Sequence, residues 1–301
     1  RQFNIESKPE LELINQVALE MGKVVDVSIR VNPGVDAKTH RKITTGTKND
    51  KFGVSFENTK SMFEIGSKMK GLSFVGLDMH IGSQISTLSA FSLSFSRLRS
   101  MVLELRHSGH NLSRLDVGGG IGIEHKLNGG SSISVDSYSN LLREYFNDLD
   151  CEIELEPGRF LVGNAGILVS SVIYTKLGDR NNFLIIDAAM NDLLRPALYD
   201  ACHQLVPVKE FSEKASSMYD IVGPVCESSD TFERSVKLAP MNSGDLVAFS
   251  SAGAYGAVMA SEYNTRPLIP EVLVSGNLYA IIKNRPQVSE IISRDKIPDW
   301  L

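Results

Sequence analysis

The 301-residue sequence is poor in cysteine, with only Cys151, Cys202 and Cys226. An odd, scattered set fits neither a disulfide framework nor a CxxC metal site, so we expect a reducing compartment and no bound metal. No apolar run approaches the roughly 20 residues that span a bilayer. The opening residues RQFNIESKPE contain neither a signal-peptide architecture nor an initiator methionine. We therefore expect a soluble cytoplasmic protein with no membrane partner, whose sequence is given without its true beginning.

The sequence also has no excess of positive charge. It contains 31 Lys and Arg residues against 36 Asp and Glu residues, a net charge of −5. There is no basic stripe of the kind that a nucleic-acid backbone requires, so nucleic acid is excluded as a partner. Apolar residues at 42% and charged residues at 22% are ordinary for a globular protein of one large or two medium domains.

Residues 1–162 alternate short β-rich segments with amphipathic helical patterns. We expect strands at 3–7, 24–31, 72–80, 115–117 and 151–155 and helices at 7–22, 57–70, 91–105 and 137–149. Ser7 and Glu10 have the spacing of a capping box for the first helix. Strands that alternate with helices indicate a parallel sheet, either doubly wound or closed into a barrel.

Residues 163–301 have a different pattern. Six strand-like segments are separated by turns rich in Gly and Asn, with few long helices between them: 167–174, 183–186, 219–222, 245–249, 271–274 and 278–282. This pattern predicts a second, mainly antiparallel β domain.

Two motifs follow apolar strands of the first domain, where parallel α/β proteins place their active sites. His80 could act as an acid or base, or lie against a planar cofactor; a structural histidine is the alternative. Gly118, Gly119 and Gly120 could bring backbone amides close to an anion such as phosphate. The spacing is not GxGxxG, and a tight turn without a ligand is equally compatible with it.

Two further motifs carry a carboxylate and a thiol. Glu154 and Glu156 share one face of the fifth strand. A carboxylate in a barrel mouth needs a cation, which could be Arg159 or a cationic ligand ring that leaves Arg159 for an anion. In the polar turn 223–230, Cys226 could be a proton donor, a nucleophile or a bystander.

Nine segments, in order along the chain, carry a family resemblance. They are Phe3–Ser7, Arg30–Gly34, Lys51–Gly53, His80–Ser83, Gly118–Gly120, Glu156–Arg159, Arg195–Tyr199, Gly223–Glu227 and Ala252–Tyr255. Together they resemble the diaminopimelate decarboxylases, a family of fold-type III, alanine-racemase-like enzymes that use pyridoxal 5'-phosphate. The resemblance implies a (β/α)8 TIM barrel followed by a β domain, and a head-to-tail homodimer with shared active sites.

The resemblance also assigns roles in cofactor binding. His80 would stack on the cofactor ring and contribute to catalysis, and Glu156 would face the pyridine nitrogen. The phosphate would be held by residues of both domains, and the cofactor-binding set is Ser83, Gly118, Gly119, Gly120, Gly158, Arg159 and Tyr255. A carboxylate at the pyridine nitrogen keeps that nitrogen protonated, so that the ring can accept the electrons left when CO2 departs.

The remaining assignments concern a small amino-acid substrate. The resemblance implies that its distal end is bound by Arg159, Arg195, Tyr199, Glu227 and Tyr255. Arg195 and Glu227 together suit a carbon that carries both a carboxylate and an ammonium, as in meso-2,6-diaminopimelate. Cys226 would donate a proton in the partner subunit's site, and residues 40–51 would form a mobile active-site loop.

One family feature is not found. The Schiff-base lysine of the family lies in a Tyr-x-x-Lys-Ala-Asn-like segment of the first barrel strand, and no such segment occurs here. Lys176 and Lys283 both map to the second domain and are not credible substitutes. We therefore expect a truncated sequence that covers about barrel strands 4–8, and a chain that cannot form the Schiff base alone.

Three hypotheses for function remain after this comparison. The first is that the full-length parent decarboxylates meso-2,6-diaminopimelate to L-lysine, the last step of lysine biosynthesis. The second is a non-catalytic homologue that kept the fold and the dimer surface. The third is a decarboxylase for another basic amino acid.

Overall fold

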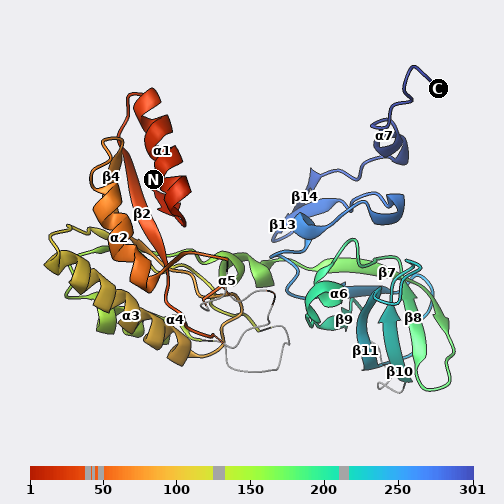
Figure 1. Ribbon diagram of the computed structural model, residues 1–301. Helices are drawn as coiled ribbons and strands as arrows, with labels where there is room; N and C mark the ends of the chain where they lie inside the picture. The colour runs from red at the N-terminus through yellow and green to blue at the C-terminus, as the bar shows by residue number, and fades with distance from the viewer. Residues whose placement is uncertain (38–41, 43–44, 47–50, 125–132, 210–216) are drawn as a thin grey trace. The chain divides into compact units, whose positions relative to one another are not determined.

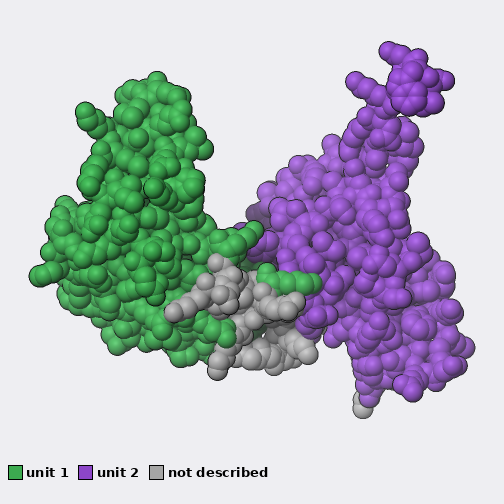
Figure 2. Space-filling view, viewed as in Figure 1, with its two compact units in different colours: residues 1–124, 130–161 green, residues 125–129, 162–301 purple. Residues whose placement is uncertain are grey.

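The computed structural model describes residues 1–37, 42, 45–46, 51–124, 133–209 and 217–301. These residues form two compact units, coloured separately in Figure 2: unit 1 holds described residues up to Leu161, and unit 2 those from Val162 onward. Most of the loop predicted at 40–51 lies outside the described residues. None of the helices in the described part of the chain has both the length and the apolar character that a membrane span requires.

Unit 1 is a parallel β-sheet whose strands are connected by helices (Figure 1). The strands are β1 (Phe3–Ile5), β2 (Val25–Asn32), β3 (Val54–Ser55), β4 (Leu72–Asp78), β5 (Arg114–Asp116) and β6 (Glu152–Glu154). The helices between them are α1 (Lys8–Glu20), α2 (Phe56–Gly66), α3 (Leu88–His107) and α4 (Val135–Phe146). The sheet order is β1-β2-β4-β5-β6, with the short β3 paired to β2. The predicted alternation of strands and helices and the partial-barrel fold class are confirmed. The short strand β3 was not predicted from the sequence.

The two faces of this sheet differ in polarity because side chains alternate along each strand. Ile29, Leu77 and Leu115 are completely buried in the core that the strands share with the helices. The residue that follows each of them is charged and faces the other way: Arg30, Asp78 and Asp116. The sheet therefore separates an apolar helix-covered face from a face that carries charged groups at the carboxyl ends of the strands.

The start of α1 differs slightly from the predicted capping box. The Ser7 hydroxyl accepts a hydrogen bond from the backbone N–H of Glu10 (3.4 Å), as predicted. The Glu10 carboxylate, however, accepts from the N–H of Glu6 (2.7 Å) and not from Ser7. The two caps still satisfy two backbone donors, because Glu10 reaches one residue further back along the chain.

Unit 2 is a six-stranded sheet with a separate hairpin. Its strands are β7 (Leu168–Lys176), β8 (Asn182–Ile186), β9 (Leu205–Pro207), β10 (Ser217–Val222), β11 (Thr231–Leu238), β12 (Leu246–Phe249), β13 (Glu271–Ser275) and β14 (Leu278–Lys283). Its short helices, with α5 spanning the boundary between the units, are α5 (Gly158–Val162), η1 (Gly163–Ala165), α6 (Arg195–Tyr199), η2 (Ala257–Met259), η3 (Tyr263–Thr265) and α7 (Val288–Ile292).

The sheet order in unit 2 is β11-β10-β8-β7-β12-β9, and β13 pairs with β14. All of these pairings are antiparallel except β8 with β10, which is parallel. The predicted mainly antiparallel β domain is confirmed, and the prediction omitted β9 and β11. Leu184, Ile186, Ile221 and Val247 are completely buried between the strands.

Candidate active site

A row of charged residues crosses the ends of four parallel strands in unit 1. Arg30 is paired in register with Asp78, Asp78 with Asp116, and Asp116 with Glu154. Glu156 comes two residues after Glu154. Sequence reasoning missed Arg30, Asp78 and Asp116 as site residues. The available signal was a charged residue directly after an apolar one (Ile29, Leu77 or Leu115) in the second half of the strand.

Three carboxylates of this site lie close together. Single oxygens of Asp78, Asp116 and Glu156 all lie within 4.8 Å of one another, a spacing that could hold a metal ion. Other groups already engage two of them: Arg30 Nε lies 3.8 Å from Asp78 Oδ2, and the N–H of Gly118 donates to Asp116 Oδ1 (2.9 Å). The Arg30 guanidinium beside the cluster offsets its negative charge. That the site binds no metal ion remains a prediction.

Burial and mutual repulsion change the protonation of these acids. Burial, followed by the charges of Asp116 and Glu156, raises the pKa of Asp78 well above its usual range. Burial, followed by Asp116, also raises the pKa of the half-exposed Glu156. Oδ1 of Asp78 is buried and has no hydrogen-bond partner among the described residues. Asp78 is therefore the acid of this cluster that holds a proton most readily.

Asp78→Asn is expected to change how the stability of unit 1 depends on pH. Because the folded-state pKa of Asp78 is raised, its contribution to stability is complete below about pH 4 and is lost as pH rises through the raised pKa. Asparagine stays neutral, so the variant should become more stable than the wild type as pH rises. Urea unfolding at pH 4 to 8 measures the difference. The exposed Asp136→Asn control should show no such trend, and a D78N protein less stable at every pH would contradict the expectation.

His80 is held in its neutral form. The backbone N–H of Gly119 donates to Nδ1 of His80 (3.2 Å), so this nitrogen is an acceptor. Burial, followed by the charge of Arg30, lowers the pKa of His80. Glu156 Oε2 lies 3.9 Å from the same nitrogen. An ion pair between them would require a proton on Nδ1, and the hydrogen bond that Nδ1 accepts from Gly119 excludes that proton. The structure thus brings His80 and Glu156 together without a charged bond between them.

The glycine turn after β5 is packed tightly against two neighbouring strand ends. A Cβ would lie 2.4 Å from Met79 O at Gly118, 2.0 Å from Glu156 O at Gly119 and 2.2 Å from Gly82 O at Gly120. Gly118 and Gly120 also have positive φ. The N–H groups of Gly118 and Gly119 bond to Asp116 and His80. Among the described residues, the N–H of Gly120 donates no hydrogen bond and is the amide available to an anion.

Ser83, Gly158 and Arg159 complete the sequence-predicted residues of unit 1. Arg159 is buried and donates from Nη2 to the Ser83 hydroxyl (3.2 Å), which leaves the serine O–H able to donate elsewhere. The alternative in which Arg159 pairs with Glu156 remains a prediction. A Cβ on Gly158 would meet open space, so packing does not explain that glycine.

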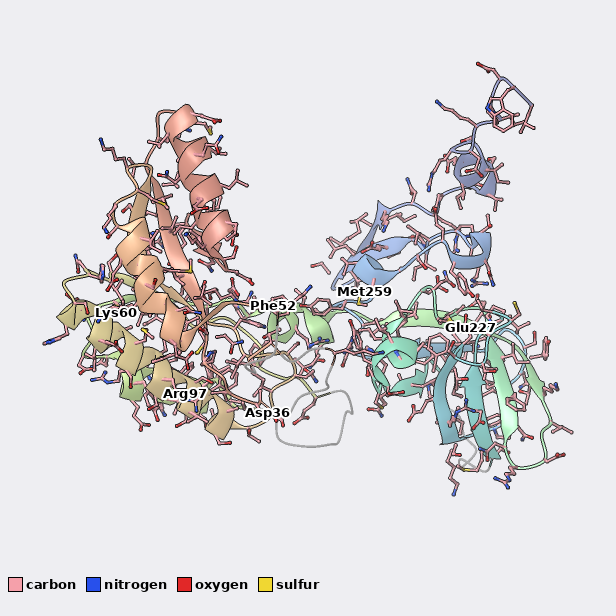
Figure 3. The ribbon with its side chains drawn as sticks, viewed as in Figure 1. Asp36, Phe52, Lys60, Arg97, Glu227 and Met259 are labelled. Atoms are coloured by element: carbon pink, nitrogen blue, oxygen red, sulfur yellow. The ribbon has the colours of Figure 1, made fainter. Side chains whose placement is uncertain are left out.

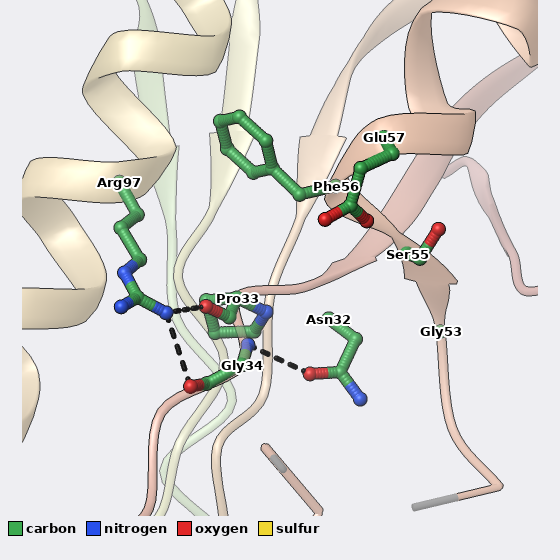
Figure 4. A pocket seen from close by; sticks show the side chains of 8 residues that line it. All are labelled: Asn32, Pro33, Gly34, Gly53, Ser55, Phe56, Glu57 and Arg97. Atoms are coloured by element: carbon green, nitrogen blue, oxygen red, sulfur yellow. Dashed lines mark hydrogen bonds between the residues drawn. The ribbon is translucent and has the colours of Figure 1, made fainter. Parts of the chain in front are cut away.

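A separate hollow of about 520 Å³ lies beside the loop after β2. Figure 4 shows Arg97 of α3 reaching the backbone oxygens of Pro33 and Gly34, the latter at 3.0 Å. The Asn32 side chain accepts from the N–H of Gly34 (2.9 Å). None of the sequence-predicted site residues lines this hollow.

The predicted substrate residues of unit 2 lie on α6 and on a nearby turn. Arg195 begins α6 and is 3% exposed, and Tyr199 ends the same helix and is half-buried. Cys226 and Glu227 are exposed in the turn after β10, and Figure 3 labels Glu227. Asp230 accepts hydrogen bonds from the N–H groups of Val225 and Met190 (both 2.7 Å), which fixes this turn.

Tyr263 is a further polar residue that sequence reasoning missed. Its hydroxyl donates to Oε2 of Glu227 (2.8 Å), and Ser229 bonds to the other oxygen. These hydrogen bonds, that of Ser229 first, lower the pKa of Glu227 and keep it charged. No sequence motif joins residues 36 positions apart, so only the fold identifies the pair.

Tyr255 has an unusual backbone conformation. Its φ is 58°, and its side chain is 45% exposed. Bulky residues rarely adopt positive φ, and such strain costs about 1–3 kcal/mol. Strain at an exposed tyrosine is typical of functional positions, and Tyr255 is one of the predicted phosphate and substrate residues.

The similarity to known proteins covers the whole chain. Residues 1–163 match the family described as pyridoxal-dependent decarboxylase, pyridoxal binding domain. Diaminopimelate decarboxylase of Zymomonas mobilis is 42% identical over 300 residues, 100% of this chain and 71% of the relative. The Haemophilus influenzae enzyme is 43% identical over 97% of this chain and 70% of its own. The chain belongs to the diaminopimelate decarboxylase family.

Solved structures of this family agree with the fold described above. Diaminopimelate decarboxylase from Helicobacter pylori, complexed with L-lysine, superposes with a TM-score of 0.92 at 36% identity. The match covers 97% of this chain and 72% of that one. The fold of this chain is therefore that of a diaminopimelate decarboxylase.

Proposed function

We propose that this chain provides the cofactor and substrate groups of an enzyme that decarboxylates meso-2,6-diaminopimelate to L-lysine and CO2. The observation that carries the proposal is the meeting of His80, Glu156 and the glycine turn at the ends of three neighbouring parallel strands. The relatives named above support the substrate.

The residues present in unit 1 fit pyridoxal 5'-phosphate. The glycine turn offers a surface that any Cβ would fill. The N–H of Gly120 and the O–H of Ser83 are available hydrogen-bond donors. Arg159 lies beside Ser83 and donates to its hydroxyl. Glu156 offers a half-exposed carboxylate to a pyridine nitrogen. Gly118, Gly119, Gly158 and Tyr255 are proposed to contact the phosphate, as the family resemblance implies.

The cofactor, when bound, supplies an electron sink for the carbanion that remains after loss of CO2. Glu156 would keep a proton on a pyridine nitrogen bound beside it, because a carboxylate raises the pKa of a neighbouring cation. The neutral His80 presents a flat face without adding a positive charge that would compete with the protonated ring. Gly119 fixes the orientation of that face through its bond to Nδ1.

Five residues are proposed to recognise the end of the substrate that does not react. Arg195, with Arg159, Tyr199 and Tyr255, binds the distal carboxylate, and Glu227 accepts the distal ammonium. Tyr263 and Ser229 keep Glu227 charged for this role. Cys226, exposed beside Glu227, donates the proton that replaces CO2.

Substrate comparison tests this assignment in the active enzyme that contains the chain. We expect lysine release from meso-2,6-diaminopimelate and negligible amine release from ornithine and arginine, which lack the distal carboxylate. Equal or faster release from ornithine would favour a decarboxylase for another basic amino acid. No turnover of any of the three would favour a non-catalytic homologue.

We infer that residues 1–301 alone do not bind the cofactor covalently. Lys283 pairs with Glu271 (3.2 Å) on the β13–β14 hairpin, and Lys176 ends β7, so neither belongs to the parallel sheet of unit 1. Borohydride treatment of this chain with pyridoxal phosphate, followed by peptide mass spectrometry, should yield no stoichiometric lysine adduct. A full adduct at any lysine would contradict the inference.

We also propose a homodimer in which Cys226 and Glu227 serve the partner's site. Mixing the inactive variants Glu156→Gln and Cys226→Ala should then restore about a quarter of wild-type activity, because half of the dimers are mixed and one of their two sites is intact. If each site used residues of a single chain, mixing would restore nothing.

A further inference from the structure

His203 lies directly against Arg195 inside unit 2. Nη1 of Arg195 is 3.0 Å from Nε2 of His203, and Nδ1 of His203 is 2.9 Å from the backbone oxygen of Ser250. The two side chains are 3% and 2% exposed. Both contacts are therefore made out of water, where a mismatched donor or acceptor is costly.

The turn after α6 brings the two residues together. Asp200 adopts a left-handed conformation with φ 51°, and its N–H donates to the backbone oxygen of Arg195. The N–H of Ser250, just after β12, donates to the oxygen of Gln204 (2.9 Å), which holds the segment after His203 against that strand. The imidazole is thus anchored on one side to β12 and on the other to the guanidinium.

The chemistry of arginine settles which nitrogen of His203 carries the proton. A guanidinium has only donors and keeps its charge in proteins. Nε2 must therefore accept, and the ring proton sits on Nδ1, where it donates to Ser250 O. The other tautomer would oppose two N–H donors across 3.0 Å and leave the carbonyl without this donor.

We propose that His203 is a positioning residue for Arg195. It accepts a hydrogen bond from one guanidinium N–H and so fixes the plane of the Arg195 guanidinium, the group that binds the distal carboxylate of the substrate. The proposal rests on the proposed function in one respect, the assignment of Arg195 to that carboxylate. A rigid guanidinium loses less entropy on binding an anion, so the expected effect lies in substrate affinity and not in the rate of the chemical step.

Two matched substitutions separate the two hydrogen bonds. His203→Gln can place an oxygen where Nε2 lies and keep the acceptor for Arg195. His203→Asn can place an N–H where Nδ1 lies and keep only the bond to Ser250. In the active enzyme we expect H203N to raise KM for meso-2,6-diaminopimelate about 10- to 100-fold, with kcat within about twofold, and H203Q to restore most of the loss.

The controls distinguish failure of this proposal from failure of the proposed function. If Arg195→Met leaves KM unchanged, the role of Arg195 itself is wrong. If Arg195→Met raises KM but H203N does not, or if H203N and H203Q reduce kcat and thermal stability equally, His203 is only structural and the proposal is overturned.

A measurement without turnover keeps the proposal testable even where one of the two variants fails to fold. Nitrogen-15 NMR of the wild-type protein should show His203 with its proton on Nδ1 and none on Nε2, with the signal assigned by its loss in H203Q or H203N. A proton on Nε2 would contradict the proposal.

Discussion

Replacing Glu156 with glutamine is expected to lower kcat/KM for meso-2,6-diaminopimelate by about 10²- to 10³-fold in the active enzyme, the usual loss when one preorganised charge-stabilising group is removed. Glutamine keeps the size of the side chain but no longer favours a proton on the pyridine nitrogen. The nearby Asp116 and Asp78 do not replace it, since the first is bonded to Gly118 and the second is the acid that most readily holds a proton.

The matched control is Glu152→Gln, at the start of β6, the strand that Glu156 follows. Glu152 pairs with Arg1 and lies 3.8 Å from Arg114, remote from the glycine turn. We expect its kcat/KM to stay within about twofold of the wild type. Steady-state assays of lysine release measure both variants. A Glu156→Gln enzyme within about threefold of wild type would contradict the role of Glu156.

Replacing Arg195 with methionine is expected to reduce kcat/KM for the same substrate by about 30- to 4,000-fold. Truncating one partner of a buried, hydrogen-bonded charge pair costs about 2–5 kcal/mol, and each 1.4 kcal/mol is tenfold. Methionine has a similar apolar length, so packing around this 3% exposed position is largely kept. The kcat/KM of Arg195→Lys should lie between those of the wild type and Arg195→Met. Lysine keeps the positive charge but lacks the planar guanidinium that can bond to both carboxylate oxygens.

A substrate without the distal carboxylate provides the sharpest control for Arg195. Lysine decarboxylation, measured as cadaverine release, should be slow in the wild type and nearly unchanged in Arg195→Met. The exposed Arg234→Met, whose guanidinium lies 3.5 Å from Asp220, should leave both rates unchanged. An equal loss on both substrates would mean that Arg195 supports the fold and not the recognition of a carboxylate.

The sequence predicts the fold of unit 1 well because its strands and helices have regular periods. Strand cores such as 27–29 and helix residues such as Leu11 and Ala18 are buried as their spacing indicates. The missed strands of unit 2 lack that regularity. β11 has register shifts against β10 and a positive φ at Ser235, and β9 is three residues long and ends at Pro207. The parallel pairing of β8 with β10 is not visible in the sequence at all.

The candidate site was only partly predictable from the sequence. Glycine runs and His or Glu residues after strands mark the positions of the glycine turn, His80 and Glu156. The cluster of Asp78, Asp116 and Arg30 depends on strand register, and the contacts of Tyr263 with Glu227 and of His203 with Arg195 depend on tertiary packing. Sequence reasoning therefore identified the groups proposed to touch ligands more readily than the groups that hold them in place.

A crystal structure of the active enzyme with pyridoxal phosphate bound tests the central claim most directly. We expect the Glu156 carboxylate within about 2.6–3.0 Å of the pyridine nitrogen, and a phosphate oxygen within hydrogen-bond distance of the Gly120 N–H and the Ser83 hydroxyl. A cofactor seated away from the glycine turn, or a Glu156 carboxylate that makes no contact with the ring nitrogen, would contradict the account.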